Sequence, residues 1–196
     1  MTKKEIEQVK EALVALVGTP MRTFDRSGAM LFLNFGDYVD ANGTVVRDAS
    51  GAVMRDEAGN ALYKKSRRGM YALSSLCSMR FTCGSDVIFA GSDIFLPTEN
   101  LANDEGFNGS NFDWQTPGNT LFDDLLRKHF RGDFSEYVVK SVKVGRFGDL
   151  NIGFENDFVL EFFADGSGHS ENWRFGMVNS TDSLIVTSKG IINESD

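Results

Sequence analysis

The chain has 196 residues, a length within the usual range for one domain and sufficient to build a hydrophobic core. Apolar residues make up 41% and charged residues 24%, a balance typical of a globular protein. The net charge of −8 argues against generic binding to a nucleic-acid backbone, which needs clustered cations. No segment approaches the ~18 consecutive apolar residues of a membrane span. We therefore expect neither a nucleic acid nor a membrane as a partner.

The charge is divided unevenly along the chain. Residues 1–70 carry 11 Lys and Arg against 9 acidic residues, whereas residues 71–196 carry 9 against 19, a net of −10. Such an acidic body permits a basic protein partner, although acidity also simply maintains solubility. Acidic residues follow directly where a signal peptide would have its apolar core, and the 2 Cys make no disulfide framework, so we expect a cytoplasmic location.

Residues 3–17 form the first expected helix. Thr2 and Glu5 fit a capping box, and apolar residues then recur at helical spacing until Gly18. A hairpin is expected next, with strands at residues 21–24 and 29–35.

A segment with a period of eight residues follows this hairpin. Gly43, Gly51 and Gly59 mark three short copies, too few for a solenoid, so residues 40–68 are interpreted as a protruding or partly mobile insertion. The basic run at residues 64–68 is typical of a solvated linker and less often forms a contact patch.

From Tyr71 to Phe81 apolar residues alternate with polar ones, which predicts a strand with Cys77 facing inward and therefore unreactive. A return strand is expected at residues 87–90. Residues 98–119 are rich in Asn, Gly and Asp and predict a long loop, which is often functional or mobile at this length.

A second helix is expected at residues 121–131, capped by Thr120. Strands spaced 8–12 residues apart then indicate antiparallel neighbours. These strands lie at residues 137–144, 150–155, 158–163, 172–178 and 183–187. The predicted fold is thus α+β: one domain over residues 1–196, with an N-terminal helix and one further helix on a largely antiparallel, twisted sheet of about eight strands.

Two strands, Phe158–Phe163 and Asn172–Val178, are expected to form the central hairpin of this sheet. Pairing Phe162 with Trp173 places both in the core and puts Glu161 opposite Arg174 on the far face.

Arg80 and Arg174 each follow a large apolar residue and are expected to share one face of the sheet. If that face is covered, each guanidinium needs a carboxylate, because an unpaired buried charge is costly. Asp93, Glu161 and Glu171 are the candidate partners. The sequence leaves two interpretations open, a structural Arg–carboxylate clamp and a site for an anionic ligand.

Other chemistry-bearing residues are sparse. Asp113 and Trp114 lie in the long loop, where they form either a recognition edge or a contact that holds the loop on the core. His129 is expected to be partly buried and structural, and His169 lacks ligand spacing. No catalytic motif, metal site or cofactor site is predicted.

Several short motifs carry a resemblance to known sequences. The chain resembles, over roughly residues 71–192, a loose group of small uncharacterised bacterial proteins with a Cys-x-Trp-Arg strand, a Gly-Ser-x-Asp turn and a Glu-x-Trp-Arg strand. Met79 stands here where such sequences often have Trp, and the insertion is extra. Some small acidic α+β proteins of this kind resemble immunity proteins, which bind and block bacterial toxins. The matching motifs are Leu73–Phe81, Gly91–Asp93, Phe112–Trp114, Leu160–Phe163 and Glu171–Phe175.

The leading functional hypothesis is a non-catalytic, immunity-like module that engages a basic, toxin-like protein through an acidic face and the loop at residues 98–119. The alternative is a small-ligand-binding protein or enzyme with an Arg/carboxylate pocket. The candidate binding residues are Arg80, Asp93, Asp113, Trp114, Glu161, Glu171 and Arg174.

Overall fold

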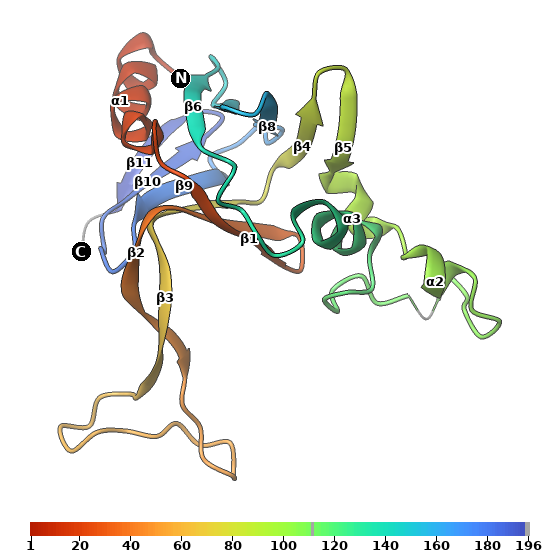
Figure 1. Ribbon diagram of the computed structural model, residues 1–196. Helices are drawn as coiled ribbons and strands as arrows, with labels where there is room; N and C mark the ends of the chain where they lie inside the picture. The colour runs from red at the N-terminus through yellow and green to blue at the C-terminus, as the bar shows by residue number, and fades with distance from the viewer. Residues whose placement is uncertain (111, 195–196) are drawn as a thin grey trace.

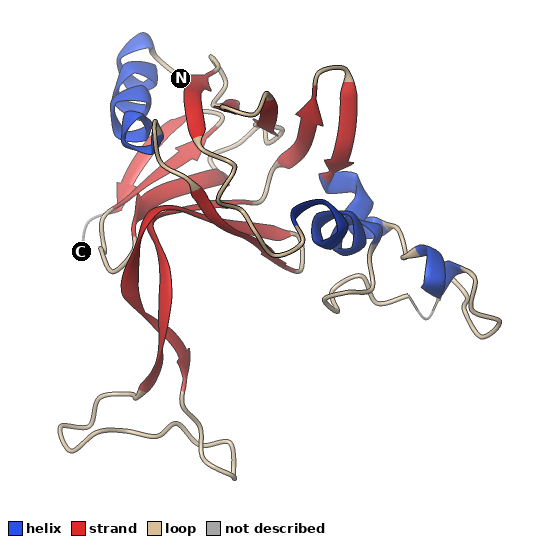
Figure 2. Cartoon of the chain, in the orientation of Figure 1, coloured by secondary structure: helices blue, strands red, loops and turns tan. Residues whose placement is uncertain are grey.

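The computed structural model describes residues 1–110 and 112–194, and within these residues it has an α+β fold with three α-helices and eleven strands (Figures 1 and 2). The predicted fold class is therefore confirmed. The strands form two antiparallel sheets, of six and five strands, rather than one sheet of about eight. Two segments project from the body, a long strand pair and a loop with a short helix (Figure 1).

The larger sheet has the order β1-β2-β3-β9-β10-β11. The N-terminal strands of this sheet meet its C-terminal strands where β3 pairs with β9. β11 was not predicted from the sequence. The strands are β1 (Met21–Ser27), β2 (Met30–Val45), β3 (Tyr63–Ser75), β9 (Glu171–Met177), β10 (Ser183–Thr187) and β11 (Gly190–Glu194).

The smaller sheet has the order β5-β4-β8-β7-β6. Short turns join β4 to β5, β6 to β7 and β7 to β8, whereas β4 and β8 pair although they are far apart in the chain. The strands are β4 (Ser78–Cys83), β5 (Asp86–Ala90), β6 (Val139–Val144), β7 (Leu150–Phe154) and β8 (Phe158–Phe163).

The helices begin where the sequence predicts. α1 (Lys3–Leu13) has the expected capping box between Thr2 and Glu5, and it passes into a 3-10 turn, η1 (Val14–Leu16), so the α-helix is shorter than predicted. α3 (Leu121–Phe130) is capped by Thr120. Within the described residues, no helix is both long and apolar enough to cross a membrane. The remaining pieces are η2 (Gly91–Phe95) and α2 (Glu99–Ala102), the latter inside the predicted loop, whose residue 111 lies outside the described residues.

Both sheets contribute their inward side chains to a single hydrophobic cluster, together with α1 and α3. Trp173 is fully buried and Phe175 nearly so, which confirms their predicted place in the core. The indole Nε1 of Trp173 donates to the carbonyl of Gly148 at 2.7 Å, so its one polar group is satisfied. Phe81 stacks on Phe89 with ring centroids 5.0 Å apart and joins an aromatic group around α3.

The predicted continuous strand from Tyr71 to Phe81 is wrong. The chain leaves the larger sheet after Ser75 and enters the smaller one at Ser78, with Leu76 exposed at the crossing. The Ser75 hydroxyl accepts a hydrogen bond from the Cys77 amide. The alternation looks unbroken because the inward residues remain inward on both sides of the crossing.

The predicted central hairpin is also wrong. β8 pairs with β4 and β7, whereas β9 pairs with β3 and β10, so the two strands belong to different sheets. Phe162 lies opposite Met79 and Leu150, and Trp173 lies opposite Ser75. The loop at residues 164–170 crosses between layers instead of making a turn, a choice that strand parity cannot reveal.

β2 and β3 continue past the body as a two-stranded arm, made of residues 38–68 (Figure 1). At its base, a Cβ on Gly69 would approach the carbonyl oxygen of Phe35 to 2.6 Å, so glycine is needed for the two strands to come this close. The predicted insertion is thus largely a strand pair whose paired part ends at Val45 and Tyr63.

The tip of the arm, residues 46–62, preserves the eight-residue period. Backbone hydrogen bonds join Val46, Met54 and Leu62 in a ring, each residue donating to the next. Between them, Asp48 and Asp56 each cap a turn by accepting two backbone N–H groups. The tip therefore has a defined backbone although Met54 and Leu62 remain exposed.

Candidate functional site

Arg80 lies on the outer face of the smaller sheet. It is opposite Glu161 across β4 and β8, and the two side chains form an ion pair. The hydrogen bond from Arg80 to Glu161 raises the pKa of the guanidinium. Asn151 also donates to Glu161, and the guanidinium lies over the Phe163 ring at 5.0 Å. The Arg80 side chain is 47% exposed, so this is a surface pair rather than a covered one.

Arg174 lies on the outer face of the other sheet. It is paired with Glu171, three residues earlier on the same strand, at 2.7 Å. The expectation that Arg80 and Arg174 share a face, with Glu161 opposite Arg174, is therefore wrong. The reason is the chain crossing between sheets, which separates the two arginines and gives each a carboxylate from its own sheet.

Asp93 does not pair with either arginine. Its carboxylate accepts the Ala90 amide at 2.8 Å, which caps the start of η2. This role is local and structural, and it accounts for the Gly91–Asp93 turn without a ligand.

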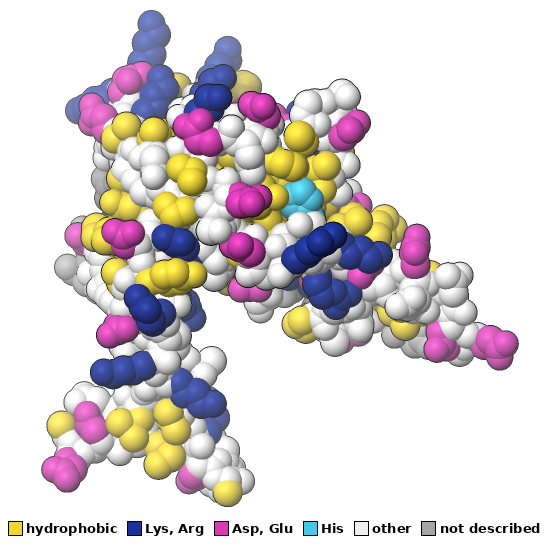
Figure 3. Space-filling model, in the orientation of Figure 1, with side chains coloured by type: hydrophobic (Ala, Val, Ile, Leu, Met, Phe, Trp, Pro, Cys, Tyr) yellow, Lys and Arg dark blue, Asp and Glu magenta, His cyan; other side chains and the backbone are white. Residues whose placement is uncertain are grey.

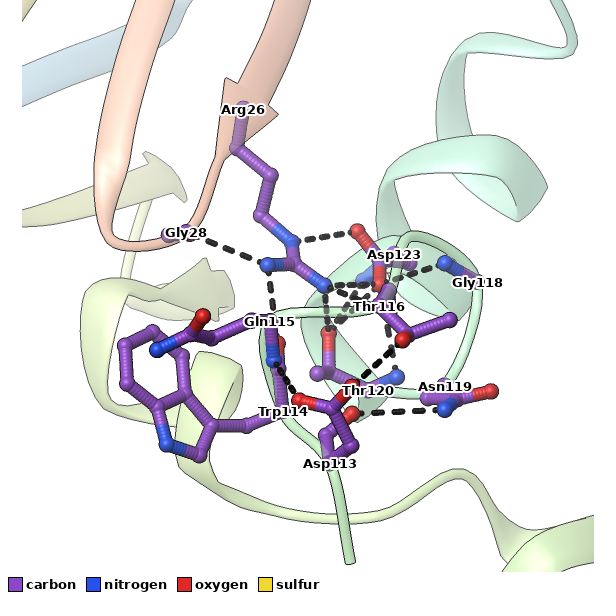
Figure 4. A network of polar contacts seen from close by, with 10 residues as sticks. All are labelled: Arg26, Gly28, Asp113, Trp114, Gln115, Thr116, Gly118, Asn119, Thr120 and Asp123. Carbon is purple, nitrogen blue, oxygen red and sulfur yellow. Dashed lines mark hydrogen bonds and ion pairs between the residues drawn. The ribbon is translucent and has the colours of Figure 1, made fainter.

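The most buried charged pair of the described residues was not predicted. Arg26 at the end of β1 is paired with Asp123 on α3, and their side chains are only 3% and 14% exposed (Figure 4). The guanidinium also donates to the carbonyl oxygens of Gly28 and Trp114. A buried guanidinium with this many acceptors fastens the end of the long loop and the start of α3 to the distant β1–β2 hairpin.

Asp123 serves the loop as well as the arginine. It accepts from the Gly118 amide at 2.9 Å and from the Thr120 hydroxyl at 2.8 Å. Partial burial opposes ionisation of this carboxyl, but hydrogen bonds from Arg26 and Thr120 outweigh it, so the pKa of Asp123 lies below its usual value. The sequence contained no sign of the ion pair with Arg26. It showed only Asp123 at a capping position of the helix, and helix capping and the helix dipole explain an acidic residue there without an arginine.

Asp113 and Trp114 hold the long loop in shape. The Asp113 carboxylate accepts from the Gln115 amide and the Thr116 hydroxyl, and these bonds lower its pKa. The Trp114 ring packs edge-on against Phe95 with centroids 5.1 Å apart. Of the two interpretations offered by the sequence, these contacts are those of a residue pair that holds the loop on the body.

Beyond this attachment the loop extends outward as an acidic projection, which we define as residues 96–119 (Figures 1 and 3). No Lys or Arg occurs from Phe81 to Leu126. At the base of the projection Phe95 and Leu96 are 54% and 48% exposed. Its carboxylates all lie at exposed residues, Glu99, Asp104, Glu105 and Asp113.

A groove of about 650 Å³ crosses the outer face of the larger sheet. Arg174 lines it and Arg80 does not, because Arg80 is on the other sheet. Arg67 and Arg68, from the base of the arm, also line the groove. It was not predicted, because it depends on how the sheet and the arm meet.

The histidines and cysteines make no reactive cluster. His129 is partly buried as predicted, its Nε2 lies 2.7 Å from the Tyr137 hydroxyl, and burial lowers its pKa. His169 is exposed in the loop at residues 164–170. Burial raises the pKa of the Cys77 thiol to about 11, so this cysteine is unreactive at neutral pH. Among the described residues no group of His, Cys, Asp and Glu is arranged to hold a metal ion.

Comparisons of this chain with family models, with curated proteins and with solved structures gave no match.

Proposed function

We propose that this chain is a non-catalytic protein-binding module that holds a basic partner protein with its acidic projection. The observation that carries the proposal is the concentration of carboxylates there. Glu99, Asp104 and Glu105 are exposed, and no cation lies within the projection to neutralise them. Such a surface attracts a basic partner during encounter and opposes acidic competitors.

The attachment of the projection supports the same proposal. Arg26 and Asp123 fasten its return to the body, and Trp114 packs on Phe95 at its base. A binding segment held in place before encounter loses less conformational entropy on binding. Phe95 and Leu96 offer partly exposed apolar surface beside the carboxylates, which is the composition of an energetically important contact.

An immunity protein is the specific form of this function that we propose. The resemblance of residues 71–192 to small acidic bacterial proteins motivates it, and a basic toxin is the partner that the charge would suit. The gene products encoded beside this chain provide the direct test. One of them should be toxic when expressed alone, and co-expression with this chain should restore growth.

A charge-reversal variant assigns such protection to the projection. The triple change Glu99→Lys, Asp104→Lys and Glu105→Lys should abolish growth rescue and weaken binding of the purified toxin by at least about 100-fold, because it replaces attraction with repulsion.

A matched control applies the same change of charge elsewhere. Asp86→Lys, Glu136→Lys and Glu155→Lys alter exposed residues outside the projection and should preserve rescue. Equal loss in both triples would mean that net charge, rather than the projection, determines binding. No toxic neighbour and no neutralisation would contradict the immunity function itself.

The alternative of a pocket built from Arg80, Arg174 and carboxylates has less support. The two arginines lie on different sheets, and each is paired with a glutamate. Only Arg174 borders a sizeable groove. That groove is considered by itself below.

A further inference from the structure

The groove follows a row of small residues across the larger sheet. Strand register aligns Thr23, Asn34, Ala72, Gly176 and Ser183 from β1 to β10, all on the outer face. None of these side chains is buried, and all of them line the groove. The floor is low because its central residues have little or no side chain.

Two walls of different origin border this floor. The next row of the sheet contributes Phe32 and Arg174, which stand above the small residues. The base of the arm contributes Arg67 and Arg68 on the other side, where β3 bends away from the body. Both walls thus contain arginines, of which Arg174 is paired with Glu171.

The groove is less acidic than the protein as a whole. Three arginines line it against two carboxylates, Asp25 and Asp182, in a chain whose net charge is −8, and one of the three, Arg174, is already paired with Glu171. Among the described residues the Arg68 side chain has no ion-pair or hydrogen-bond partner, although its backbone lies in the β2–β3 ladder, and the Arg67 guanidinium lies over the Tyr38 ring at 5.3 Å. These two guanidinium groups are available to an anion.

The two carboxylates stand near the two ends of the row. Asp25 is on β1 and Asp182 is in the turn before β10, where its carbonyl oxygen lies beside Gly176. The pattern is negative at each end and positive in the middle. It suits an occupant that has an acidic group at its centre and N–H donors toward its ends.

We propose that this groove binds an extended peptide segment with a central Asp or Glu. Five strands spaced about 4.8 Å apart give the floor a length of about 19 Å, which matches about six residues in extended conformation. The central carboxylate pairs with the arginines at the base of the arm, while backbone N–H groups donate to the end carboxylates. Small side chains of the peptide pack on Ala72 and Gly176.

The proposal is tested by titrating isotopically labelled protein with terminally blocked hexapeptides. A panel with Glu at the third position and varied small neighbours is compared with the same panel carrying Gln or Lys there. The Glu peptides should shift the amide signals of Ala72, Ser74 and Gly176, and they should bind at least 10-fold more tightly than the Gln peptides. The Lys peptides should leave these signals unchanged.

Variants locate the binding. The double change Arg67→Glu and Arg68→Glu should weaken binding of the Glu peptides at least 10-fold. Lys64→Glu with Lys65→Glu makes the same change of charge on the arm outside the groove and should alter binding less than 2-fold. Ala72→Trp fills the floor and should abolish the shifts, while the denaturation midpoint shows that the fold is retained.

Four results would overturn the proposal. The first is the absence of shifts with every Glu peptide at 2 mM, a concentration that detects a site ~1 kcal/mol weaker than one with a Kd of 0.3 mM. The second is equal binding of the Gln peptides, and the third is binding of citrate as tight as that of the peptides. The fourth is a set of shifts that depend on protein concentration without any peptide. Citrate binding would assign the groove to a small anion, and concentration dependence would assign it to a second copy. None of these results bears on the acidic projection, whose test uses other residues.

Discussion

The two projections of this molecule are built on opposite principles. The arm is a strand pair, and its direction follows from the backbone ladder between β2 and β3. The acidic projection has only one short helix, α2, and depends on side chains for its attachment, above all on the buried Arg26–Asp123 pair. The comparison teaches that a loop rich in polar residues can be firmly attached to the body. One buried guanidinium can hold it in place, as a ladder of backbone hydrogen bonds holds the arm.

The largest expected effect comes from breaking that attachment. Arg26→Met leaves Asp123 partly buried without its cation and should lower the free energy of unfolding by about 3 kcal/mol. Denaturant titration measures this loss, and limited proteolysis should show faster cleavage between residues 98 and 119. Arg80→Met, which removes an arginine from an exposed pair, is the matched control and should cost far less. Equal losses would refute the special role of Arg26.

The second test weakens the base of the projection without touching a charge. Trp114→Ala removes a half-buried ring that packs on Phe95 and should cost about 2 kcal/mol, less than for a fully buried Trp. Thermal and chemical denaturation should both report it. Cleavage of the projection should also accelerate; an unchanged cleavage rate would show that Arg26 alone holds the loop.

The third test concerns the other end of α3. Burial lowers the pKa of His129, so below pH 6.5 the unfolded chain binds a proton at this residue more readily than the folded chain. The stability contributed by neutral His129 should therefore be lost as the pH falls from about 6.5 toward the lower folded-state value. Unfolding measured at several pH values should show a slope that His129→Gln reduces.

The smallest effect is expected at the arm. Replacing residues 46–62 by Asn-Gly joins Val45 to Tyr63, which already face each other, through a turn suited to a hairpin. The free energy of unfolding should change by no more than about 0.5 kcal/mol, because the tip has its own backbone ring and no part in the core. A larger loss, seen by denaturant titration, would mean that the tip supports the body.

Much of the local structure could be predicted from the sequence. The capping residues Thr2 and Thr120 mark the two long helices, and alternation identifies most strands and the buried Trp173. These features depend on residues that are neighbours in the chain. Helix caps and the buried faces of strands stay the same however the strands are arranged in sheets, because they are determined by residues close in the chain.

The arrangement of the strands could not be predicted in the same way. Inward parity is continuous from Leu73 to Met79 although the chain changes sheets between them, and parity alone does not say which strand pairs with which. The same limit hid the Arg26–Asp123 pair, whose members are 97 residues apart. It also placed Glu161 opposite Arg174 instead of Arg80, because a carboxylate opposite an arginine is defined by sheet order.

The close approach of Gly69 to Phe35 has a mechanical consequence. Beyond this point β3 extends for six residues, about 20 Å, before the tip begins. If the arm rotated about Gly69 by about 10°, its far end would move by about 4 Å. Arg67 and Arg68 lie next to Gly69, so the same rotation would move one wall of the groove relative to the sheet. A movement of the arm about Gly69 would therefore change the width of the groove together with the position of the tip.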